Sequence, residues 1–586
     1  MQEARGKGHR RPGDPKMQAR TTRTTPGDGA ARHVVLTGFM GTGKTAVGQM
    51  VARQMGRAFV DMDAEIETRA GKTIARIFAE DGEAAFRGME ATLCRELCRH
   101  PLAAPLVIAT GGGTLVDPAN RALVMESSTL ICLSCDPDGI LQRVGADGDP
   151  DRPLLDVADP RAEVERLLAA RRSAYQAIPW QIDTTGLSVE EVAAQVLHIA
   201  GVITLPVRHP GGQYEIHVGN GLLAHAGDLL RATGDRGLSQ SEGGRVAIVT
   251  NPVVAPLYAA QVAHALRSAG FDPFVCSIPD GEPHKTLATV ATLYEQFLAG
   301  GLDRSGTVLS LGGGVTGDVA GFAAATFMRG VRFVQVPTTL LAMVDASVGA
   351  KTGVDLPQGK NLVGAFKQPE LVAIDPAVLA TLPAEDLRSG MAEVIKHGII
   401  GDPALFVELE ARALRSQPPD HPATQGAVSA LLLPASQITR ALRVKIEVVE
   451  QDPFEQGRRA VLNLGHTVGH ALERLSGFAL RHGEAVGIGM VAAARIAGEL
   501  KRADASLAER VEAVLAGWGL PTRCPPFDAD GRRINVREIW AAMAHDKKRR
   551  GKTLRWVLPC AIGQVEIAED VPRSVVIAVL HNLGAN

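Results

Sequence analysis

The sequence predicts an α/β fold class: a unit with a parallel sheet, followed by a larger unit made of an α/β domain and an α-helical domain. Short apolar runs alternate with helix-length segments from residue 33 onward, and the same alternation starts again near residue 207. After residue 380 the strand signals fade and helical periodicity dominates. We therefore expect domains at 33–203, 207–380 and 381–582, behind a leader at 1–32.

The leader is basic and poor in large apolar residues. Residues 1–32 hold eight Lys or Arg against three Asp or Glu, with almost no large apolar side chains. Such a segment cannot bury enough apolar surface to fold. We expect it to be disordered and solvated, with contact to an acidic partner as the alternative.

The expected strands come in two series, each separated by helix-length segments, which favours parallel βαβ units. The first series is HVVLTG, AFVDMD, PLVIATGGG and STLICLSCD. The second series is YEIHVGNGL, RVAIVTN, DPFVCSIPDGE, GTVLSLGGG and RFVQVPTTLLAMVD.

Composition excludes several classes of protein. The formal charge of −2 argues against nucleic acid as the main partner. No apolar run reaches the roughly 18 residues of a membrane span, and no apolar segment follows the N-terminal charges, so we expect a cytoplasmic protein without membrane contact. Seven cysteines in a chain of this size favour reduced thiols. A four-thiolate zinc site from Cys94, Cys98, Cys132 and Cys135 is the alternative.

The segment GFMGTGKT is a candidate phosphate-binding loop. Gly38, Gly43, Lys44 and Thr45 fill the pattern GxxxxGK[ST] between an expected strand and an expected helix. In that context backbone N–H groups face a triphosphate, the lysine neutralises phosphate oxygens and the threonine hydroxyl reaches Mg²⁺. The alternative is a chance glycine turn. The candidate ATP contacts are Gly41, Gly43, Lys44 and Thr45.

Two carboxylates close the next expected strand, FVDMD. Asp61 and Asp63 are two positions apart, so on a strand both side chains point to one face. Beside Mg²⁺ and a γ-phosphate, such a pair suits metal support and deprotonation of a hydroxyl. The acceptor of the phosphoryl group must be read from other motifs.

Those motifs follow in the order DGEAAFRGME, ATGGG, DRPLL and ARRSAY, and with the loop they resemble shikimate kinase over residues 33–200. The resemblance implies phosphorylation of shikimate to shikimate 3-phosphate, with ATP and Mg²⁺. It implies catalytic roles for Lys44, for Asp63 as base, and for Arg152 as the lid arginine, with Asp61 and Thr45 supporting Mg²⁺.

The resemblance also implies a set of shikimate contacts. They are Asp63, Arg87, Gly111, Gly112, Gly113 and Arg171. Planar guanidinium groups suit the carboxylate because they give bidentate, orienting contacts. Taken singly, each arginine is better explained as a surface residue, and only the motif positions reverse that preference. Arg172 is the alternative to Arg171 after a shift of one residue.

The segment LNLGHTVGHALERLSGFALRHGE gathers three histidines. His466 and His470 are four apart and share a helix face, and His482 follows after a short connection. Catalytic Zn²⁺ takes about three protein ligands and keeps one open position. Glu393 in MAEVIKHG is a candidate third ligand. The alternative is a set of helix-face histidines with ordinary hydrogen bonds.

A glycine-rich turn stands between a strand and a helix in VLSLGGGVTGDVAGF. Gly312, Gly314 and Gly317 have the spacing GxGxxG, which by itself is a weak dinucleotide signal. No acidic residue closes the next strand about 20 positions on, so we expect a nucleotide pose different from the usual one.

Charged and polar residues are concentrated in segments otherwise rich in glycine and apolar residues. They are Asp345, Lys351, Lys360, Asn361 and Lys396. This concentration predicts a buried polar pocket for an anionic ligand.

The motifs GGGVTGD, FMRG, QVPTTLLAMVDASVGAKTGVD, MAEVIKHG, LNLGHTVGHALE, HGEAVGIGM and HDKK occur in the order expected of 3-dehydroquinate synthase, which residues 207–582 resemble. The resemblance implies that Zn²⁺, or Co²⁺ in its place, is held by Glu393, His466 and His482, whereas His470 faces the substrate. The implied NAD contacts are Asn251, Glu282, Lys285, Gly313, Gly314, Asp318, Thr338 and Thr339.

The implied substrate contacts include Asp345, Lys351, Lys396 and His470 in catalytic roles. The others are Asn361, Arg459, Asn463, Lys547 and Arg329, the last reaching into a neighbouring subunit's site. Lys548 is the alternative to Lys547. The implied reaction converts 3-deoxy-D-arabino-heptulosonate 7-phosphate to 3-dehydroquinate with release of phosphate. The implied assembly is a homodimer through this second unit.

Two alternatives stay open at this point. The second unit resembles other sugar-phosphate cyclases that use the same NAD and zinc apparatus. The second alternative is that one of the two units is an inactive regulatory module.

Overall fold

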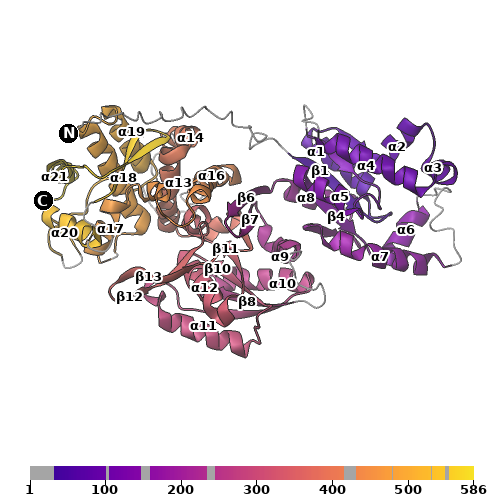
Figure 1. The fold of residues 1–586 in the computed structure, drawn as a ribbon, viewed down its shortest axis with the longest axis horizontal. Helices are drawn as coiled ribbons and strands as arrows, with labels where there is room; N and C mark the ends of the chain where they lie inside the picture. The colour runs from indigo at the N-terminus through magenta and orange to yellow at the C-terminus, as the bar shows by residue number, and fades with distance from the viewer. Residues whose placement is uncertain are drawn as a thin grey trace, which may run out of the picture.

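The computed structural model describes residues 32–99, 105–146, 159–233, 244–414, 431–477, 479–528, 531–547 and 554–586. Two units lie side by side, and the described chain passes from the first to the second through strand β6 (Figure 1). The predicted leader, apart from Arg32, lies outside the described residues, as does Arg152.

The first unit is a five-stranded parallel sheet with helices on both faces, which confirms the predicted parallel sheet. Its strand order is β2-β3-β1-β4-β5. The strands are β1 (His33–Gly38), β2 (Phe59–Asp61), β3 (Val107–Ala109), β4 (Ser128–Ser134) and β5 (Trp180–Asp183). The helices are α1 (Lys44–Met55), α2 (Met62–Ala70), α3 (Ile74–Glu80), α4 (Glu83–Arg99), α5 (Pro118–Ser127), α6 (Pro137–Ala146), α7 (Pro160–Gln176) and α8 (Val189–Ala200).

Local sequence explains where these helices begin. Asp117 accepts hydrogen bonds from the first backbone N–H groups of α5, which has proline at its first position. Ser188 and Glu191 form a capping box at the start of α8.

The second unit contains a seven-stranded sheet in the order β6-β7-β14-β11-β10-β8-β9. The β6–β7 pair is antiparallel and the other pairs are parallel. The strands are β6 (Ile203–His209), β7 (Gly212–Val218), β8 (Arg245–Thr250), β9 (Asp272–Ser277), β10 (Thr307–Gly312), β11 (Arg332–Pro337) and β14 (Leu371–Ile374). Because β6 pairs with β7, the second unit starts at Ile203.

Helices and short turns connect these strands. They are η2 (Leu222–His225), α9 (Ala226–Ala232), η4 (Ala255–Ala259), α10 (Ala260–Ser268), η5 (Glu282–His284), α11 (Leu287–Ala299), α12 (Gly314–Thr326), η6 (Phe327–Arg329), η7 (Ala342–Ala346) and η8 (Pro376–Thr381). The strand order reverses between β8 and β10. In α/β sheets of this kind, ligands bind outside the carboxyl ends of the strands at such a point.

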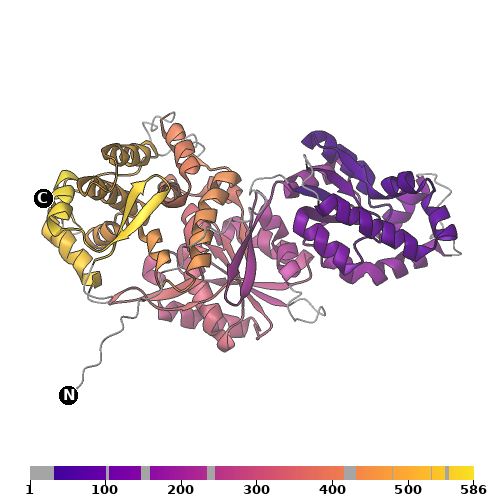
Figure 2. The ribbon, with the colours of Figure 1, turned by 45° about the horizontal axis from the view of Figure 1, so that its top comes forward.

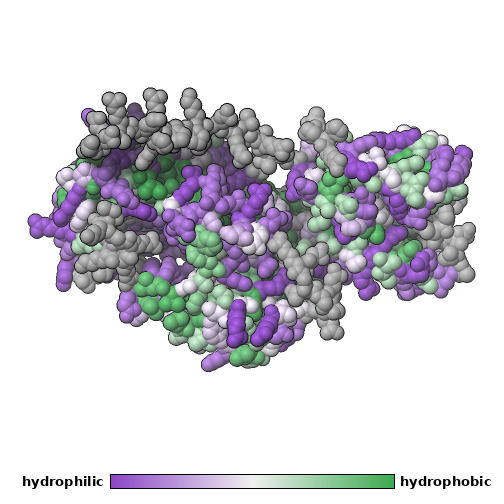
Figure 3. Space-filling view, in the orientation of Figure 1, coloured by the Kyte–Doolittle hydropathy of each residue, from purple (hydrophilic) through white to green (hydrophobic). Residues whose placement is uncertain are grey.

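Besides the antiparallel β6–β7 hairpin, two further hairpins were not predicted from the sequence. The first pairs β12 (Lys351–Leu356) with β13 (Gly359–Phe366), and the second pairs β15 (Trp556–Ala561) with β16 (Gln564–Ala568) inside the helical region. Exposed apolar side chains gather on the first hairpin and the loop beside it, where Figure 3 shows an apolar area at the surface. They are Leu362, Phe366 and Phe454.

The rest of the second unit is helical, as predicted. The elements are α13 (Ala384–Gly401), α14 (Pro403–Ala413), α16 (Ala435–Gln451), η9 (Arg458–Asn463), α17 (His466–Leu475), α18 (His482–Glu499), α19 (Ala505–Gly517), α20 (Val536–Lys547) and α21 (Arg573–Asn582). Within the described part of the chain, no helix has the length and apolar composition needed to cross a membrane.

Glycines bring α18 close to its neighbours. A Cβ at Gly483 would lie 1.9 Å from the carbonyl oxygen of Ser389, and one at Gly489 would lie 1.8 Å from that of Gly465. Only glycine permits such approaches. These contacts place the first residues of α17 and α18 beside α13.

Candidate active sites

The glycine-rich loop of the first unit has the geometry that its motif predicts. It runs from the end of β1 to Lys44, the first residue of α1, and Gly41 and Gly43 have φ values of 75° and 89°. These left-handed conformations favour glycine. The Lys44 ammonium donates to the carbonyl of Phe39 at 2.9 Å, and burial lowers the pKa of Lys44 to about 8.

Asp61 and Asp63 do not share a strand, so that prediction was wrong. Strand β2 ends at Asp61, whose side chain caps α2 by accepting from the backbone N–H groups of Asp63 and Ala64. The helix therefore starts one residue after the strand, and Asp63 lies in its first turn. The Thr45 hydroxyl donates to Asp61 at 2.8 Å. Burial, with the charge of Asp61 as a second cause, raises the pKa of Asp63 to about 6.

Three charged side chains meet at the glycine segment that follows β3. A Cβ at Gly111 would lie 2.6 Å from Oδ1 of Asp63, and one at Gly113 would lie 2.5 Å from Nη1 of Arg87. Arg171 donates to the carbonyl oxygen of Gly112 at 3.2 Å. The side chains thus lie against the segment in a way that only glycines allow. The structure brings the predicted shikimate contacts together.

The structure distinguishes Arg171 from its neighbour. The Arg171 guanidinium lies 5.3 Å from the centroid of the Phe39 ring, whereas Arg172 is exposed. Two residues at this site were missed. Glu90 is buried and accepts from Arg87 at 2.7 Å, and the Tyr175 hydroxyl donates to Gly112 at 2.6 Å. Helical spacing from Arg87 and Arg171 is the signal that could have found them.

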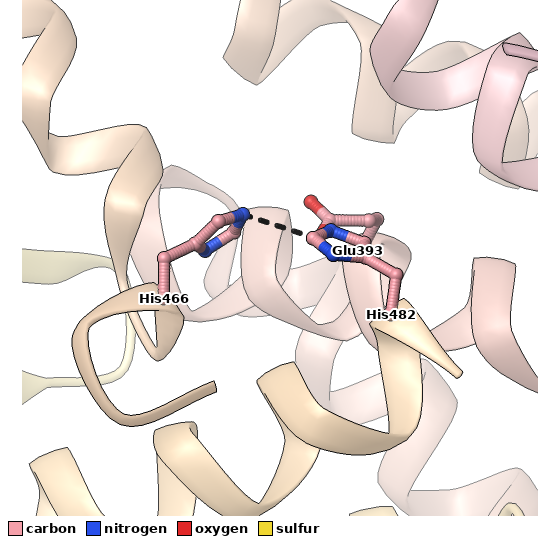
Figure 4. A group of neighbouring side chains, drawn as sticks. All are labelled: Glu393, His466 and His482. Atoms are coloured by element: carbon pink, nitrogen blue, oxygen red, sulfur yellow. Dashed lines mark ion pairs between the residues drawn. The ribbon is translucent and has the colours of Figure 1, made fainter. Parts of the chain in front are cut away.

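In the second unit, a glutamate and two histidines converge from three helices (Figure 4). Glu393 lies in the middle of α13, and His466 and His482 are the first residues of α17 and α18. Oε1 of Glu393 is 3.9 Å from Nε2 of His466 and 3.5 Å from Nε2 of His482. Their candidate ligand atoms all lie within 4.8 Å of one another. The predicted metal ligands are therefore neighbours.

The chemistry of this group fits a divalent cation. Glu393 is fully buried; its Oε2 pairs with the ammonium of Lys396, and its Oε1 faces the two imidazoles. Burial alone would raise the pKa of Glu393, but Lys396 and the two imidazoles outweigh it and hold that pKa well below its usual value. An ionised, buried carboxylate whose Oε1 lies beside two imidazole nitrogens is a suitable donor set for Zn²⁺.

The other ring nitrogen of each histidine has a partner of its own. Nδ1 of His466 lies 3.1 Å from the carbonyl oxygen of Leu464, and Nδ1 of His482 lies 3.4 Å from Oε2 of Glu473. Such contacts fix the tautomer and leave Nε2 for a metal. Burial and then Lys396 lower the pKa of His466 to about 3, which keeps its imidazole neutral. Sequence reasoning missed Glu473, although it lies three residues after His470 in HALE.

Buried cations lie next to this group. The Lys445 ammonium donates to Oδ1 of Asp345 at 2.6 Å, and Lys396 lies 4.0 Å from the same oxygen. Burial alone would raise the pKa of Asp345, but Lys445 and then Lys396 lower it, so this carboxylate is ionised. Lys445 and the buried His397 were missed. Lysine on the apolar face of α16 is the signal that could have found the first.

Other predicted substrate contacts lie around this pocket. Arg459 is buried and donates to the carbonyl oxygens of Gly349 and Pro453, each at 2.9 Å. Lys351 pairs with Glu455 at 2.7 Å. His470 is exposed, with its ring centroid 6.1 Å from that of His482. Asn463 ends η9, three residues before His466.

Five of the eight predicted NAD contacts lie at the carboxyl ends of parallel strands. Asn251 follows β8, Gly313 and Gly314 follow β10, and Thr338 and Thr339 follow β11. These positions flank the point where the strand order reverses. Gly314 begins α12, so the N-terminus of a helix faces the same edge.

An ion-pair network joins this edge to the β12–β13 hairpin. The Lys285 ammonium donates to Asp318 and to Oδ1 of Asn361, both at 2.6 Å. Lys360 lies 3.2 Å from Glu282 and 3.7 Å from Glu473. The hairpin therefore connects the predicted NAD edge with the group of candidate metal ligands.

Two predicted residues are not brought to this pocket by the described contacts. Arg329 is exposed just after the C-terminus of α12, the opposite end from Gly314. Lys547 is the last residue of α20, and its side chain and Lys548 lie outside what the structure describes.

The four-thiolate zinc alternative is not supported. Groups of candidate metal ligands among the described residues contain no cysteine. Burial raises the pKa of Cys94 and of Cys132 to about 12, which disfavours the thiolates that zinc needs.

Different family models match the two units of the chain. The shikimate kinase model matches residues 40–200. The 3-dehydroquinate synthase N-terminal model matches residues 275–389, and the C-terminal model matches residues 390–549.

Known relatives match the second unit over a longer range than the family models do. Curated 3-dehydroquinate synthases from Synechocystis sp. and Desulforamulus reducens are 47% and 44% identical, each over 381 residues, which is 64% of this chain and 99% of the relative. A solved 2-epi-5-epi-valiolone synthase from Streptomyces hygroscopicus, with NAD⁺ and Zn²⁺ bound, is 30% identical with a TM-score of 0.54. That match covers 63% of this chain and 96% of the solved one.

The fold and its sites define a chain that joins a P-loop phosphotransferase to an NAD- and metal-dependent lyase. The chain belongs to the 3-dehydroquinate synthase family, and its N-terminal part is a shikimate kinase domain. It is thus a fused enzyme of the shikimate pathway.

Proposed function

We propose that the two reactions occur at two separate sites. The first unit transfers the γ-phosphoryl group of ATP to shikimate, giving shikimate 3-phosphate. The second unit converts 3-deoxy-D-arabino-heptulosonate 7-phosphate to 3-dehydroquinate with release of phosphate. One observation carries the second assignment: Glu393, His466 and His482 converge beside the buried ammonium groups of Lys396 and Lys445. A cation centre next to fixed positive charges suits a polyol that also carries a carboxylate and a phosphate.

In the first unit, the loop from Gly41 to Thr45 binds the triphosphate of ATP. Lys44 neutralises β- and γ-oxygens, and Thr45 with Asp61 supports Mg²⁺. The contact between the Thr45 hydroxyl and Asp61 supports this pairing. Arg152, outside the described residues, takes the role of lid arginine.

Asp63, with its raised pKa, accepts the proton of the shikimate hydroxyl. Arg87 and Arg171 hold the carboxylate, and Gly111, Gly112 and Gly113 form the wall against which the ring lies. The planar guanidinium groups fix the ring orientation, which places one hydroxyl toward the loop.

The raised pKa of Asp63 predicts an acid limb in the kinase pH profile. A base must be ionised, so kcat/KM for shikimate should fall about tenfold per pH unit below about pH 6. The measurement is a steady-state profile from pH 5 to pH 8. Asp63→Asn should remove the limb together with most of the activity. A wild-type rate that stays constant down to pH 5 would rule out Asp63 as the base.

In the second unit, Glu393, His466 and His482 hold Zn²⁺, for which Co²⁺ can substitute. When bound, the metal supplies a Lewis acid for the substrate hydroxyls, and NAD⁺ accepts and returns a hydride. Asn251, Glu282, Lys285, Gly313, Gly314, Asp318, Thr338 and Thr339 bind the dinucleotide at the strand ends.

The remaining residues bind and orient the substrate. Lys396, Arg459 and Lys547 bind its anionic groups, Lys445 being a further candidate from its position. Asn361 and Asn463 supply hydrogen bonds, and His470 and Lys351 face the substrate in catalytic roles. The ionised Asp345 holds Lys445 in place and keeps a negative charge beside Lys396.

The choice of substrate can be tested against other cyclases. The curated synthase from Synechocystis sp. is 47% identical to this chain over 99% of its length, whereas the valiolone synthase is 30% identical. With NAD⁺ and Zn²⁺, we expect phosphate release from the heptulosonate 7-phosphate and none from other sugar phosphates. Release only from another sugar phosphate would overturn the assignment.

We also propose a cytoplasmic homodimer formed through the second unit. Met328 and Arg329 adopt left-handed conformations, with φ values of 49° and 71°. Such strain is typical of functional positions, and it presents an exposed arginine away from its own pocket. The exposed apolar side chains of the β12–β13 hairpin also favour contact with a second copy. Sedimentation velocity at micromolar concentration should give a dimer, and a monomer would contradict this proposal.

A further inference from the structure

The two units meet without a linker. Helix α8 ends at Ala200 and β6 begins at Ile203, so only Gly201 and Val202 lie between them. Val202 is buried. A flexible linker needs more residues, and solvated ones. We infer that the kinase unit is docked on the synthase unit through a built interface and depends on it for stability.

The centre of this interface is Trp180, the first residue of β5. Trp180 is 4% exposed and has edge contacts with two histidine rings of the second unit. The ring centroids are 6.0 Å from His217 at 89° and 5.7 Å from His225 at 77°. Edge-to-face contacts of this kind stabilise aromatic pairs beyond the burial of their area.

The strand that carries Trp180 is an edge strand. β5 ends the sheet of the first unit, and α9 of the second unit packs against it. Edge strands are commonly covered by a helix or loop, which prevents pairing with other chains. Here the covering helix, α9, belongs to the second unit, which lies next to the first unit in Figure 2.

Close backbone contacts also occur where α8 and the two residues after it meet the second unit. A Cβ at Gly221 would lie 2.4 Å from Nε2 of His198, and one at Gly219 would lie 2.8 Å from the Val202 side chain. Gly221 has a φ of 74°, a conformation that favours glycine. The backbone of the second unit therefore approaches the last turn of α8 as closely as a packed core.

Buried apolar side chains continue across the boundary. Val192, Val196 and Ile199 of the first unit belong to the same buried cluster as Leu223 and Leu229 of the second. A contiguous cluster of this kind normally marks one core. At the rim, Nδ1 of His225 lies 3.6 Å from Asp228, which also pairs with Arg231.

The docked strand leads to the nucleotide loop. Thr184 directly follows β5, and its hydroxyl accepts from Nη1 of Arg143 at 2.8 Å. The same nitrogen lies 3.4 Å from the carbonyl oxygen of Gly41, which it can donate to. Kinase activity is therefore a sensitive measure of the integrity of β5.

The test uses the full chain and a substitution in the second unit alone. His225→Ala removes one of the two histidine rings that contact Trp180 without touching either active site. The temperature at which half of the kinase activity is lost should be about 3–6 °C lower than in wild type. A shift of a few °C is what the loss of one contact produces in a domain of this size. Hydrogen exchange of the β5 amides should be about tenfold faster. His264→Ala, an exposed histidine on α10, is the matched control and should change neither.

Synthase activity verifies that the His225→Ala protein is folded. Unchanged kinase inactivation and unchanged β5 exchange in this variant would overturn the inference. If the variant does not fold, small-angle scattering of the wild type decides: one rigid particle with the dimensions of the docked chain supports the inference, and an ensemble of detached units refutes it. The proposal concerns docking, so it stands or falls separately from the substrate assignments.

Discussion

Lys44→Ala should abolish phosphorylation of shikimate while leaving the cyclisation reaction at its wild-type rate. The ammonium is the fixed positive charge of the nucleotide loop, held at 2.9 Å from the carbonyl of Phe39. Losing one group that stabilises transition-state charge typically costs about 100–1000-fold in kcat. The measurement is ATP-dependent formation of shikimate 3-phosphate, with phosphate release from the heptulosonate substrate measured on the same preparation.

Lys44→Arg is the control for this prediction. It keeps the charge but not the compact ammonium, so it should recover binding of ATP without full turnover. Wild-type kinase activity in Lys44→Ala would show that the loop does not hold the transferring phosphate.

His466→Ala should have the reverse effect: the synthase reaction falls to background and the kinase reaction is unchanged. The imidazole is one of three candidate ligands whose donor atoms lie within 4.8 Å of one another. Removing a direct ligand should weaken metal binding by more than the roughly 10–100-fold that follows loss of an outer partner. The measurement is zinc content after dialysis, together with the rate of phosphate release.

A control variant shows whether the effect is specific to a metal ligand or follows from replacing any histidine. His264→Ala changes an exposed histidine of α10 and should leave zinc content and both rates unaltered. Full zinc occupancy in His466→Ala would contradict the assignment of this residue as a ligand.

Sequence motifs predicted the parallel sheets because these depend on local patterns, whereas the candidate metal ligands come from distant segments of the chain. GxxxxGK[ST] fixes a strand, a loop and a helix together, and the structure has all three around Lys44. Glu393 is separated from His466 by more than 70 residues, and only the resemblance to a known family joined them. Geometry then placed them 3.9 Å apart.

Other features depend on contacts that no local pattern encodes. Asp61 and Asp63 were predicted on one strand, but the capping bonds accepted by Asp61 start a helix after that residue. The β12–β13 hairpin was missed because its sequence is rich in charged residues and glycine rather than alternating apolar ones. The burial of Lys445 against Asp345 spans 100 residues of sequence. Trp180 gave no signal of its interface, since its partners His217 and His225 belong to the other unit.

The most direct test of the account assays both reactions in folded preparations of Lys44→Ala and His466→Ala, with circular dichroism to verify the fold. Two independent pockets predict a crossed pattern, in which each protein loses one reaction and keeps the other at its wild-type rate. A folded protein that loses both reactions after either substitution would contradict the account.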